Sequence, residues 1–102
     1  MTARLRVLIF AAAPGDDPDA VVRAYHRISR DLRGTPGLIS NELLRATTDE
    51  ARFIVMSEWE SVEAFEVWER GSAHKGTTAP LRQYQDSSRG APFGLYEVAA
   101  AY

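Results

Sequence analysis

The pattern of hydrophobic and polar residues predicts six main elements of secondary structure. Over Arg4–Ala12 the apolar residues alternate and, toward the middle, occupy both faces, which is typical of a strand covered on both sides. Asp17 and Pro18 then predict the start of a helix, with aspartate at the N-cap and proline in the first turn. Apolar residues recur at steps of three and four as far as Arg33, which predicts a core-facing stripe. That stripe consists of Val21, Tyr25, Ile28 and Leu32.

Two strands and a helix follow a turn rich in glycine and proline. The strands are Leu38–Thr47 and Phe53–Trp59, and the short polar segment between them predicts a hairpin. Ser61 fits the N-cap of a helix over 61–70, because its hydroxyl can accept a hydrogen bond from a free backbone N–H. A further short helix is expected over Ala73–Gln85, or from Pro80 onward, since proline fits poorly inside a helix. Phe93–Tyr102 is predicted to be the last strand.

The order strand, helix, strand, strand, helix, strand predicts an α+β fold of the ferredoxin-like βαββαβ type. Such a fold has a four-stranded antiparallel sheet with its helices on one face. Strands this apolar should not leave their other face in water. We therefore expect a homodimer in which two sheets pack about a two-fold axis, forming a dimeric α/β barrel.

Length and composition narrow the class of protein further. The chain has 102 residues, which suits a single domain over 1–102, and 45% of them are hydrophobic. A net charge of −2 without a basic stripe argues against nucleic-acid or membrane binding, and the absence of cysteine excludes thiol chemistry. The N-terminal segment has the arginines and apolar run of a signal peptide, but the run is short and serves the first strand. We expect a cytoplasmic protein.

One motif carries a family resemblance. From Trp59 the chain reads WESVEAF, followed by Trp68 and then by SAH, which ends at His74. A tryptophan thus closes a strand, a small polar residue and an Ala-Phe pair follow in the helix, and a histidine comes after it. This pattern resembles the antibiotic biosynthesis monooxygenase family of small dimeric α/β-barrel proteins. The order of the elements extends the resemblance to the whole chain.

The resemblance implies a cofactor-independent monooxygenase or a related tailoring enzyme. Members of this kind oxidise a polycyclic phenol, such as an aromatic polyketide intermediate, to a quinone with molecular oxygen and without flavin, haem or metal. The position of their strand asparagine matches Val55 here. The alternative is therefore a non-catalytic small-molecule-binding protein or an accessory protein of a biosynthetic pathway. The haem-degrading branch needs an axial histidine further along the chain than His74, so we expect no haem and no other cofactor.

Six side chains are the candidates for the site. Trp59, Phe65 and Trp68 are predicted to bind an aromatic substrate, although amphipathic helices also bury such residues as plain core. By the resemblance, His74 is the candidate base. A free imidazole titrates near pH ~6.5, so it can accept a phenol proton at neutral pH. The alternative is that His74 only forms a hydrogen bond with a loop carbonyl. Tyr25 and Tyr84 could orient a substrate oxygen or satisfy a backbone carbonyl. No spacing of His, Asp or Glu indicates a metal site.

Overall fold

A computed structural model describes residues 3–71 and 74–102, with His74, Lys75 and Thr77 described by their backbone alone. The chain forms four strands and three helices in an order that confirms the predicted α+β arrangement. The elements are β1 (Leu5–Ala12), α1 (Ala20–Leu32), β2 (Leu38–Arg45), β3 (Arg52–Trp59), α2 (Val62–Arg70), α3 (His74–Arg82) and β4 (Phe93–Glu97). Among the described residues no helix is long and apolar enough to cross a membrane.

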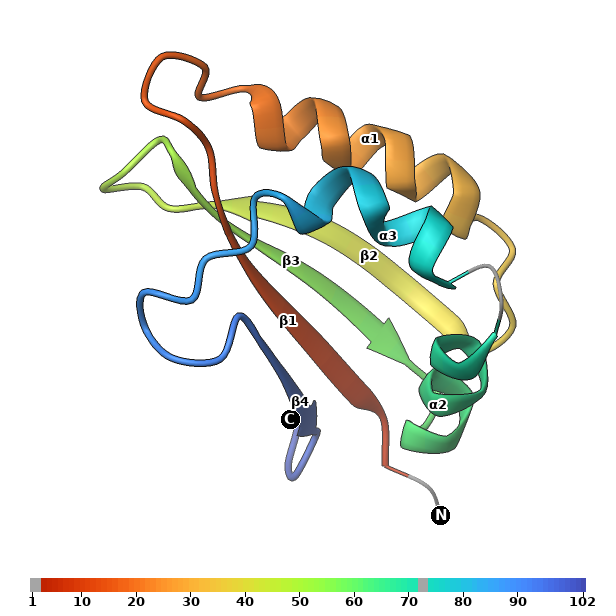
Figure 1. The fold of residues 1–102 in the computed structure, drawn as a ribbon. Coiled ribbons are helices and arrows are strands. Elements are labelled where there is room, and N and C mark those ends of the chain that lie inside the picture. The colour runs from red at the N-terminus through yellow and green to blue at the C-terminus, as the bar shows by residue number, and fades with distance from the viewer. Residues whose placement is uncertain (1–2, 72–73) are drawn as a thin grey trace.

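The four strands form one antiparallel sheet in the order β2-β3-β1-β4, which is the predicted ferredoxin-like topology. The sheet is open, with β2 and β4 at its edges and β1 and β3 in the middle. Ile9 on β1 lies opposite Val55 on β3 and Phe93 on β4, so these three side chains share one face. Figure 1 shows α1 and α3 side by side over the sheet and α2 at the end of β3.

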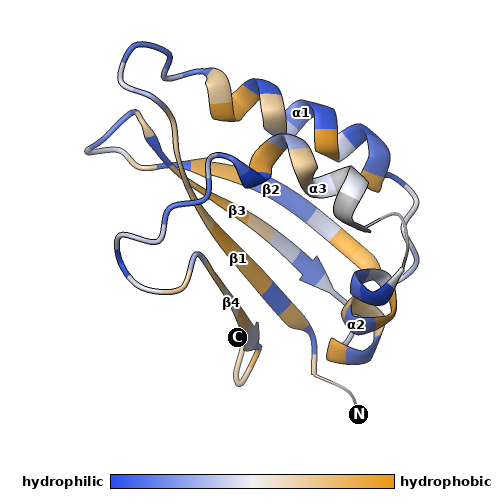
Figure 2. Ribbon diagram, in the orientation of Figure 1, coloured by the Kyte–Doolittle hydropathy of each residue, from blue (hydrophilic) through white to orange (hydrophobic). Residues whose placement is uncertain are grey.

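The hydrophobic core lies between the sheet and the helices. Alternate residues of β1 and β3 point toward the helices and are buried, and α1 adds the apolar stripe predicted from its spacing. Leu81 of α3 joins the same core. Figure 2 shows hydrophobic residues along much of β1 and β3 and at intervals along α1. The buried residues that form the main cluster are Ala11, Val21, Ala24, Ile28, Phe53, Val55 and Leu81.

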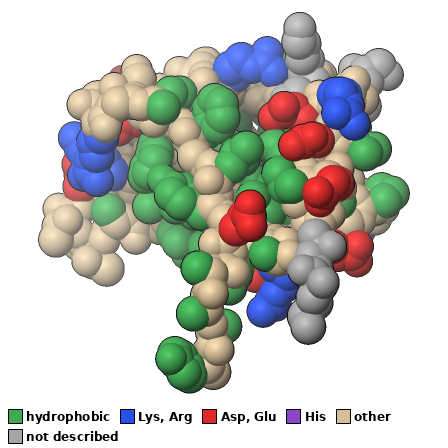
Figure 3. Space-filling model, turned by 90° about the horizontal axis from the view of Figure 1, so that it is seen from below, with side chains coloured by type: hydrophobic (Ala, Val, Ile, Leu, Met, Phe, Trp, Pro, Cys, Tyr) green, Lys and Arg blue, Asp and Glu red, His purple; other side chains and the backbone are tan. Residues whose placement is uncertain are grey.

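The outer face of the sheet also carries apolar side chains. The residues between the buried positions of β1 and β3 point away from the helices, because side chains alternate along a strand. Leu8 and Met56 lie directly opposite each other there and are only half-buried. Tyr96 on β4 is 54% exposed and its ring covers Gly94, where a Cβ would lie 2.7 Å from the ring. Figure 3, viewed from below Figure 1, shows hydrophobic side chains gathered across the middle of the molecule.

Two predicted boundaries are wrong. Helix α1 begins at Ala20 rather than near Pro18, because Asp17 lies in a turn whose carbonyl accepts from Ala20 N–H. The Asp17 carboxylate instead pairs with Arg23 and raises the pKa of that guanidinium. Strand β4 ends at Glu97, well before the predicted Tyr102.

The sequence left two alternatives for the last helix, and the structure has the one that continues through Pro80. Helix α3 begins at His74 and continues through Pro80 to Arg82. Proline removes one backbone hydrogen bond from a helix, but tertiary packing routinely overrides such local preferences. Leu81, which is 3% exposed, supplies that packing by inserting into the core next to Pro80.

Candidate functional site

A cavity lies between the sheet and the helices, near the end of β3 where α2 begins. Its volume is about 170 Å³, and every helix and strand contributes to its lining. Apolar residues of α1, β1 and β3 form most of the wall, including Ile28, Val7 and Val55. A cavity of roughly 150 Å³ with apolar walls is large enough to bind benzene, so this one has room for a single aromatic ring.

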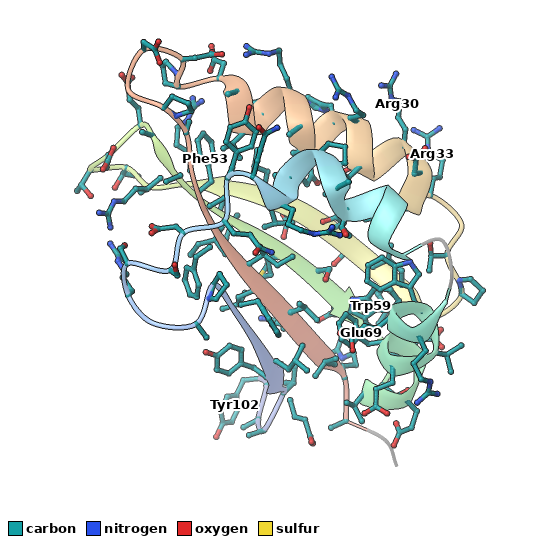
Figure 4. The ribbon with its side chains drawn as sticks, in the orientation of Figure 1. Arg30, Arg33, Phe53, Trp59, Glu69 and Tyr102 are labelled. Atoms are coloured by element: carbon teal, nitrogen blue, oxygen red, sulfur yellow. The ribbon has the colours of Figure 1, made fainter. Side chains whose placement is uncertain are left out.

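Three aromatic side chains form one wall of this cavity. Trp59 ends β3 and is 1% exposed, and the ring centroids of Phe65 and Trp68 on α2 lie 5.4 and 5.3 Å from its own. Phe65 meets Trp59 edge to face at 77°, whereas Trp68 is inclined to it by 35°. Figure 4 shows Trp59 beside Glu69 at the α2 end of the sheet, with Phe53 at the far end of the same strand. We call this group the aromatic wall.

Local features of the sequence hold the aromatic wall together. The Ser61 hydroxyl accepts a hydrogen bond of 3.1 Å from Ala64 N–H, so the predicted N-cap is confirmed. Gly37 has a φ of +84°, and a Cβ there would lie only 2.5 Å from the Cβ of Ala64. Its carbonyl accepts from Glu60 N–H at 2.8 Å. The glycine therefore lets the loop before β2 pack directly against the first turn of α2. This contact positions α2, and with it Trp68, relative to Trp59.

Two polar side chains, Asn41 and Ser57, line the cavity side by side on paired strands. Ser57 Oγ accepts a hydrogen bond of 2.9 Å from the indole N–H of Trp59. Asn41 Nδ2 donates to Ser29 Oγ on α1 at 3.2 Å, while its Oδ1 is buried. The sequence interpretation missed both residues. The available signal was a polar residue in the inward-facing series of a strand, as in Phe53, Val55, Ser57 and Trp59.

The predicted site residues fall into two groups in space. Trp59, Phe65 and Trp68 come together in the cavity lining. Tyr25 and Tyr84 are half-buried beside the main core cluster and are not among the described residues of that lining. The Tyr25 hydroxyl donates to the backbone carbonyl of Asn41 at 2.9 Å, which is the bond that a satisfied core tyrosine makes.

The remaining candidate, His74, is the first residue of α3, and its side chain lies outside the described part of the chain. Thr78, four residues later, lines the cavity. Within the described ranges, no group of three or more His, Cys, Asp or Glu side chains could hold a metal ion.

A second hollow, of about 130 Å³, lies at the other end of β3. Its lining includes Arg45, Arg52, Asp86 and Arg89, so it is charged and open at the surface. The Arg45 guanidinium lies 4.9 Å from the centre of the Phe53 ring and covers it. The cavity at the aromatic wall is the better candidate for a ligand site, because such sites are mostly apolar with few convergent polar groups.

Comparison with known proteins agrees with the fold and the motif. A family model described as antibiotic biosynthesis monooxygenase matches residues 4–79. The structure is similar to that of a mutant of SnoaB, a cofactor-independent oxygenase from Streptomyces nogalater, with a TM-score of 0.79 and 16% identity over 99% of this chain and 97% of that one. At that identity the likeness shows the fold alone.

Two relatives were found by sequence, and the name of only the second states an activity. Protein SchA of Streptomyces halstedii is 29% identical over 82 residues, which are 80% of this chain and 22% of SchA. A mycobilin-producing heme oxygenase of Mycobacterium tuberculosis is 37% identical over 68 residues, or 64% of each chain. This chain therefore spans about a fifth of the first relative and less than two thirds of the second.

The haem named for one relative can be tested against the cavity. Proteins hold haem iron through histidine, cysteine, methionine or tyrosine side chains. None of the described residues that line the cavity is of these types. The described part of the lining thus does not fit haem.

Proposed function

This chain belongs to the antibiotic biosynthesis monooxygenase family, and we propose that it oxidises a phenolic polycycle with molecular oxygen in the cavity at the aromatic wall. The observation that carries the proposal is the aromatic wall itself. Trp59, Phe65 and Trp68 present ring faces and edges to one apolar space, and flat aromatic ligands pack well against such surfaces.

The size of the cavity limits how the substrate sits. A volume of about 170 Å³ accommodates one ring. Trp68 is half-buried and Phe93 is 50% exposed, so both reach from the cavity to the surface. In the proposed complex the reacting ring lies inside against Trp59, and the remaining rings extend outward between Trp68 and Phe93.

The proposed chemistry needs one proton acceptor and oxygen. A deprotonated anthrone-type substrate is electron-rich enough to reduce O₂, and a carbon–oxygen bond forms to give a peroxide. Loss of water from the peroxide leaves a carbonyl, so one oxygen atom enters the quinone and the other leaves as water. The protein has to exclude bulk water, hold the ring and accept the proton.

His74 is the proposed proton acceptor. The family resemblance supports this role, and His74 is the first residue of α3, the helix whose Thr78 lines the cavity. Tyr25 and Tyr84 lie outside the described lining, and the Tyr25 hydroxyl is already bonded to a carbonyl. In this proposal neither tyrosine contacts the substrate, and Tyr25 supports β2.

We also propose that two chains pair through the outer faces of their sheets. Leu8, Phe10 and Met56 are apolar and only half-buried there, and Leu44 is 40% exposed. Contiguous apolar surface of this kind is typical of a protein interface. The pairing would bury these side chains and leave the aromatic wall on the opposite face of each sheet.

A binding protein without catalysis is the second candidate. Val55 lines the cavity where quinone-forming members carry asparagine, so the wall at that point offers no hydrogen bond. Such a protein would hold the same class of ligand and release it unchanged.

The test is oxygen consumption with hydroxylated anthrones and no added flavin or metal. Because anthrones oxidise spontaneously, each rate is compared with buffer alone and with the heat-denatured protein. Under ¹⁸O₂ the catalysed reaction should place a single labelled atom in the quinone. Rates equal to the spontaneous ones across the panel, together with saturable ligand binding, would exclude the oxygenase and favour the binding protein.

A further inference from the structure

Ser57 is the polar residue in the inward-facing row of β3. Its neighbours in that row, Val55 and Trp59, are 4% and 1% exposed, whereas Ser57 is half-buried and lines the cavity. The backbone of Ser57 is enclosed between β1 and β2, where it lies opposite Val7 and Asn41. The side chain is therefore the part of Ser57 that reaches the cavity, since alternate residues of a strand point to the same face.

The Ser57 hydroxyl keeps one unused donor. A serine hydroxyl has one O–H donor and two acceptor lone pairs. One lone pair accepts the indole N–H of Trp59 at 2.9 Å, and this bond holds the oxygen in place. No acceptor for the hydroxyl hydrogen is found in the described part of the chain. A hydroxyl whose oxygen already accepts a hydrogen bond is also a stronger donor, because hydrogen bonds in a chain polarise one another.

We propose that Ser57 binds the substrate by donating a hydrogen bond to an oxygen atom on the ring that lies against Trp59. This inference rests on the proposed aromatic-ligand site. It narrows the ligand class to polycycles with a carbonyl or an ionised hydroxyl on the inserted ring. Val55, one inward position earlier on β3, also lines the cavity but has no polar atom in its side chain. Ser57 is thus the donor that β3 presents to the ligand.

The same bond assists the proposed reaction. When His74 takes a proton from the ring carbon opposite the carbonyl of an anthrone, the electron pair of that C–H bond is delocalised onto the carbonyl oxygen. The oxygen becomes negatively charged, and hydrogen bonds to a charged acceptor are stronger than those to a neutral one. The bond from Ser57 therefore strengthens as the charge develops and favours the electron-rich form that reduces oxygen.

The test uses two ligands that differ in one carbonyl oxygen. 1-Indanone and indane each carry a single aromatic ring, for which the cavity has room, and only 1-indanone offers an acceptor. Calorimetry gives the dissociation constant of each compound, and the ratio of the two constants is the readout. Both compounds are titrated into the same protein sample, so any loss of folded protein affects them alike and leaves the ratio unchanged.

Three variants separate ligand recognition from a structural role. Ser57→Ala should lower the preference for 1-indanone roughly 2- to 12-fold relative to wild type, which is the usual net effect of one hydrogen bond. Ser57→Thr restores the hydroxyl and should restore the ratio. Ser40→Ala removes an exposed hydroxyl from β2 and should leave the ratio at its wild-type value.

Two results would overturn the inference. If Ser57 only holds Trp59 in place, Ser57→Ala weakens the binding of both compounds to the same extent and the ratio does not change. A wild-type protein that binds neither compound would also overturn it.

The result is independent of catalysis, because neither compound is a substrate of the proposed reaction. A protein whose preference depends on Ser57 but that consumes no oxygen with anthrones would keep this inference and lose only the reaction. A protein that oxidises anthrones and shows the same ratio in Ser57→Ala would lose the role of Ser57 and keep the reaction.

Discussion

The indole N–H of Trp59 donates a hydrogen bond of 2.9 Å to Oγ of Ser57, two residues earlier on the same face of β3. Trp59 is 1% exposed, so this bond satisfies a nitrogen that water does not reach. It also fixes the tilt of the indole ring against which Phe65 and Trp68 pack. The geometry of the aromatic wall thus depends on a polar residue, Ser57, that is not itself part of the wall.

Ser57→Ala should therefore destabilise the protein by about 1–3 kcal/mol, because it leaves the buried indole N–H unpaired. Urea denaturation measures the loss, and the near-ultraviolet circular dichroism of the tryptophans should change with it. Ser57→Thr restores the hydroxyl and should recover most of the stability. Ser40→Ala, an exposed serine on β2, should stay within about 0.5 kcal/mol of wild type. A Ser57→Ala protein as stable as this control would show that the bond contributes nothing.

Gly37→Ala should be more damaging than the same change at Gly34. Both glycines have positive φ, so alanine is strained by about 1–2 kcal/mol at either position. At Gly37 the new Cβ would also lie 2.5 Å from Ala64, whereas at Gly34 nothing lies within 4 Å. Overpacking adds about 1–3 kcal/mol, so we expect a total near 2–5 kcal/mol at Gly37 by denaturant unfolding. If the two variants lost equal stability, the clash with Ala64 would contribute nothing, because α2 could shift away from the new Cβ without loss of stability.

Leu8→Glu tests the proposed pairing of two sheets. Leu8 lies in the middle of the outer face, where a dimer would bury the introduced carboxylate without a partner. The wild-type protein should sediment as a dimer at micromolar concentration, and the variant as a folded monomer. Val67→Glu makes a similar change on the exposed side of α2 and should leave the dimer intact. A wild-type monomer, or a dimeric Leu8→Glu protein, would contradict the pairing.

His74→Ala separates a base from a structural residue. As the proton acceptor, His74 should contribute about 10²–10⁴ to the rate, and its removal should leave a folded dimer. The loss should shrink as pH rises, since the substrate then ionises without help. If His74 only bonds a carbonyl, its removal instead lowers stability by about 0.5–1.5 kcal/mol and leaves turnover unchanged. The rate profile and the melt of one sample distinguish these results.

Much of the fold could be predicted because local and tertiary preferences agree there. Alternation in β1 and β3, the stripe on α1 and the Ser61 cap all match the structure. Prediction failed where a side-chain contact outside the local sequence pattern determines where a helix begins. Asp17 pairs with Arg23 instead of capping α1. For α3 the sequence left two alternatives open, and the burial of Leu81 accounts for the one that runs through Pro80.

The aromatic half of the site was predictable and the polar half was not. Trp59, Phe65 and Trp68 follow from strand end and helix spacing. Asn41 looks like a surface residue in a strand of mixed pattern, and only the packing of α1 over β2 buries its Oδ1. Tyr25 shares the stripe of α1, yet its hydroxyl turns to a backbone carbonyl because β2 passes within reach.

The most direct test of the aromatic wall as a ligand site is a crystal structure with 2-hydroxyanthraquinone bound. We predict one ring inside the cavity, packed against the indole ring of Trp59. The outer rings should pass between Trp68 and Phe93. A ligand found only outside the cavity, for example on the outer face of the sheet beside Leu8, would contradict the account.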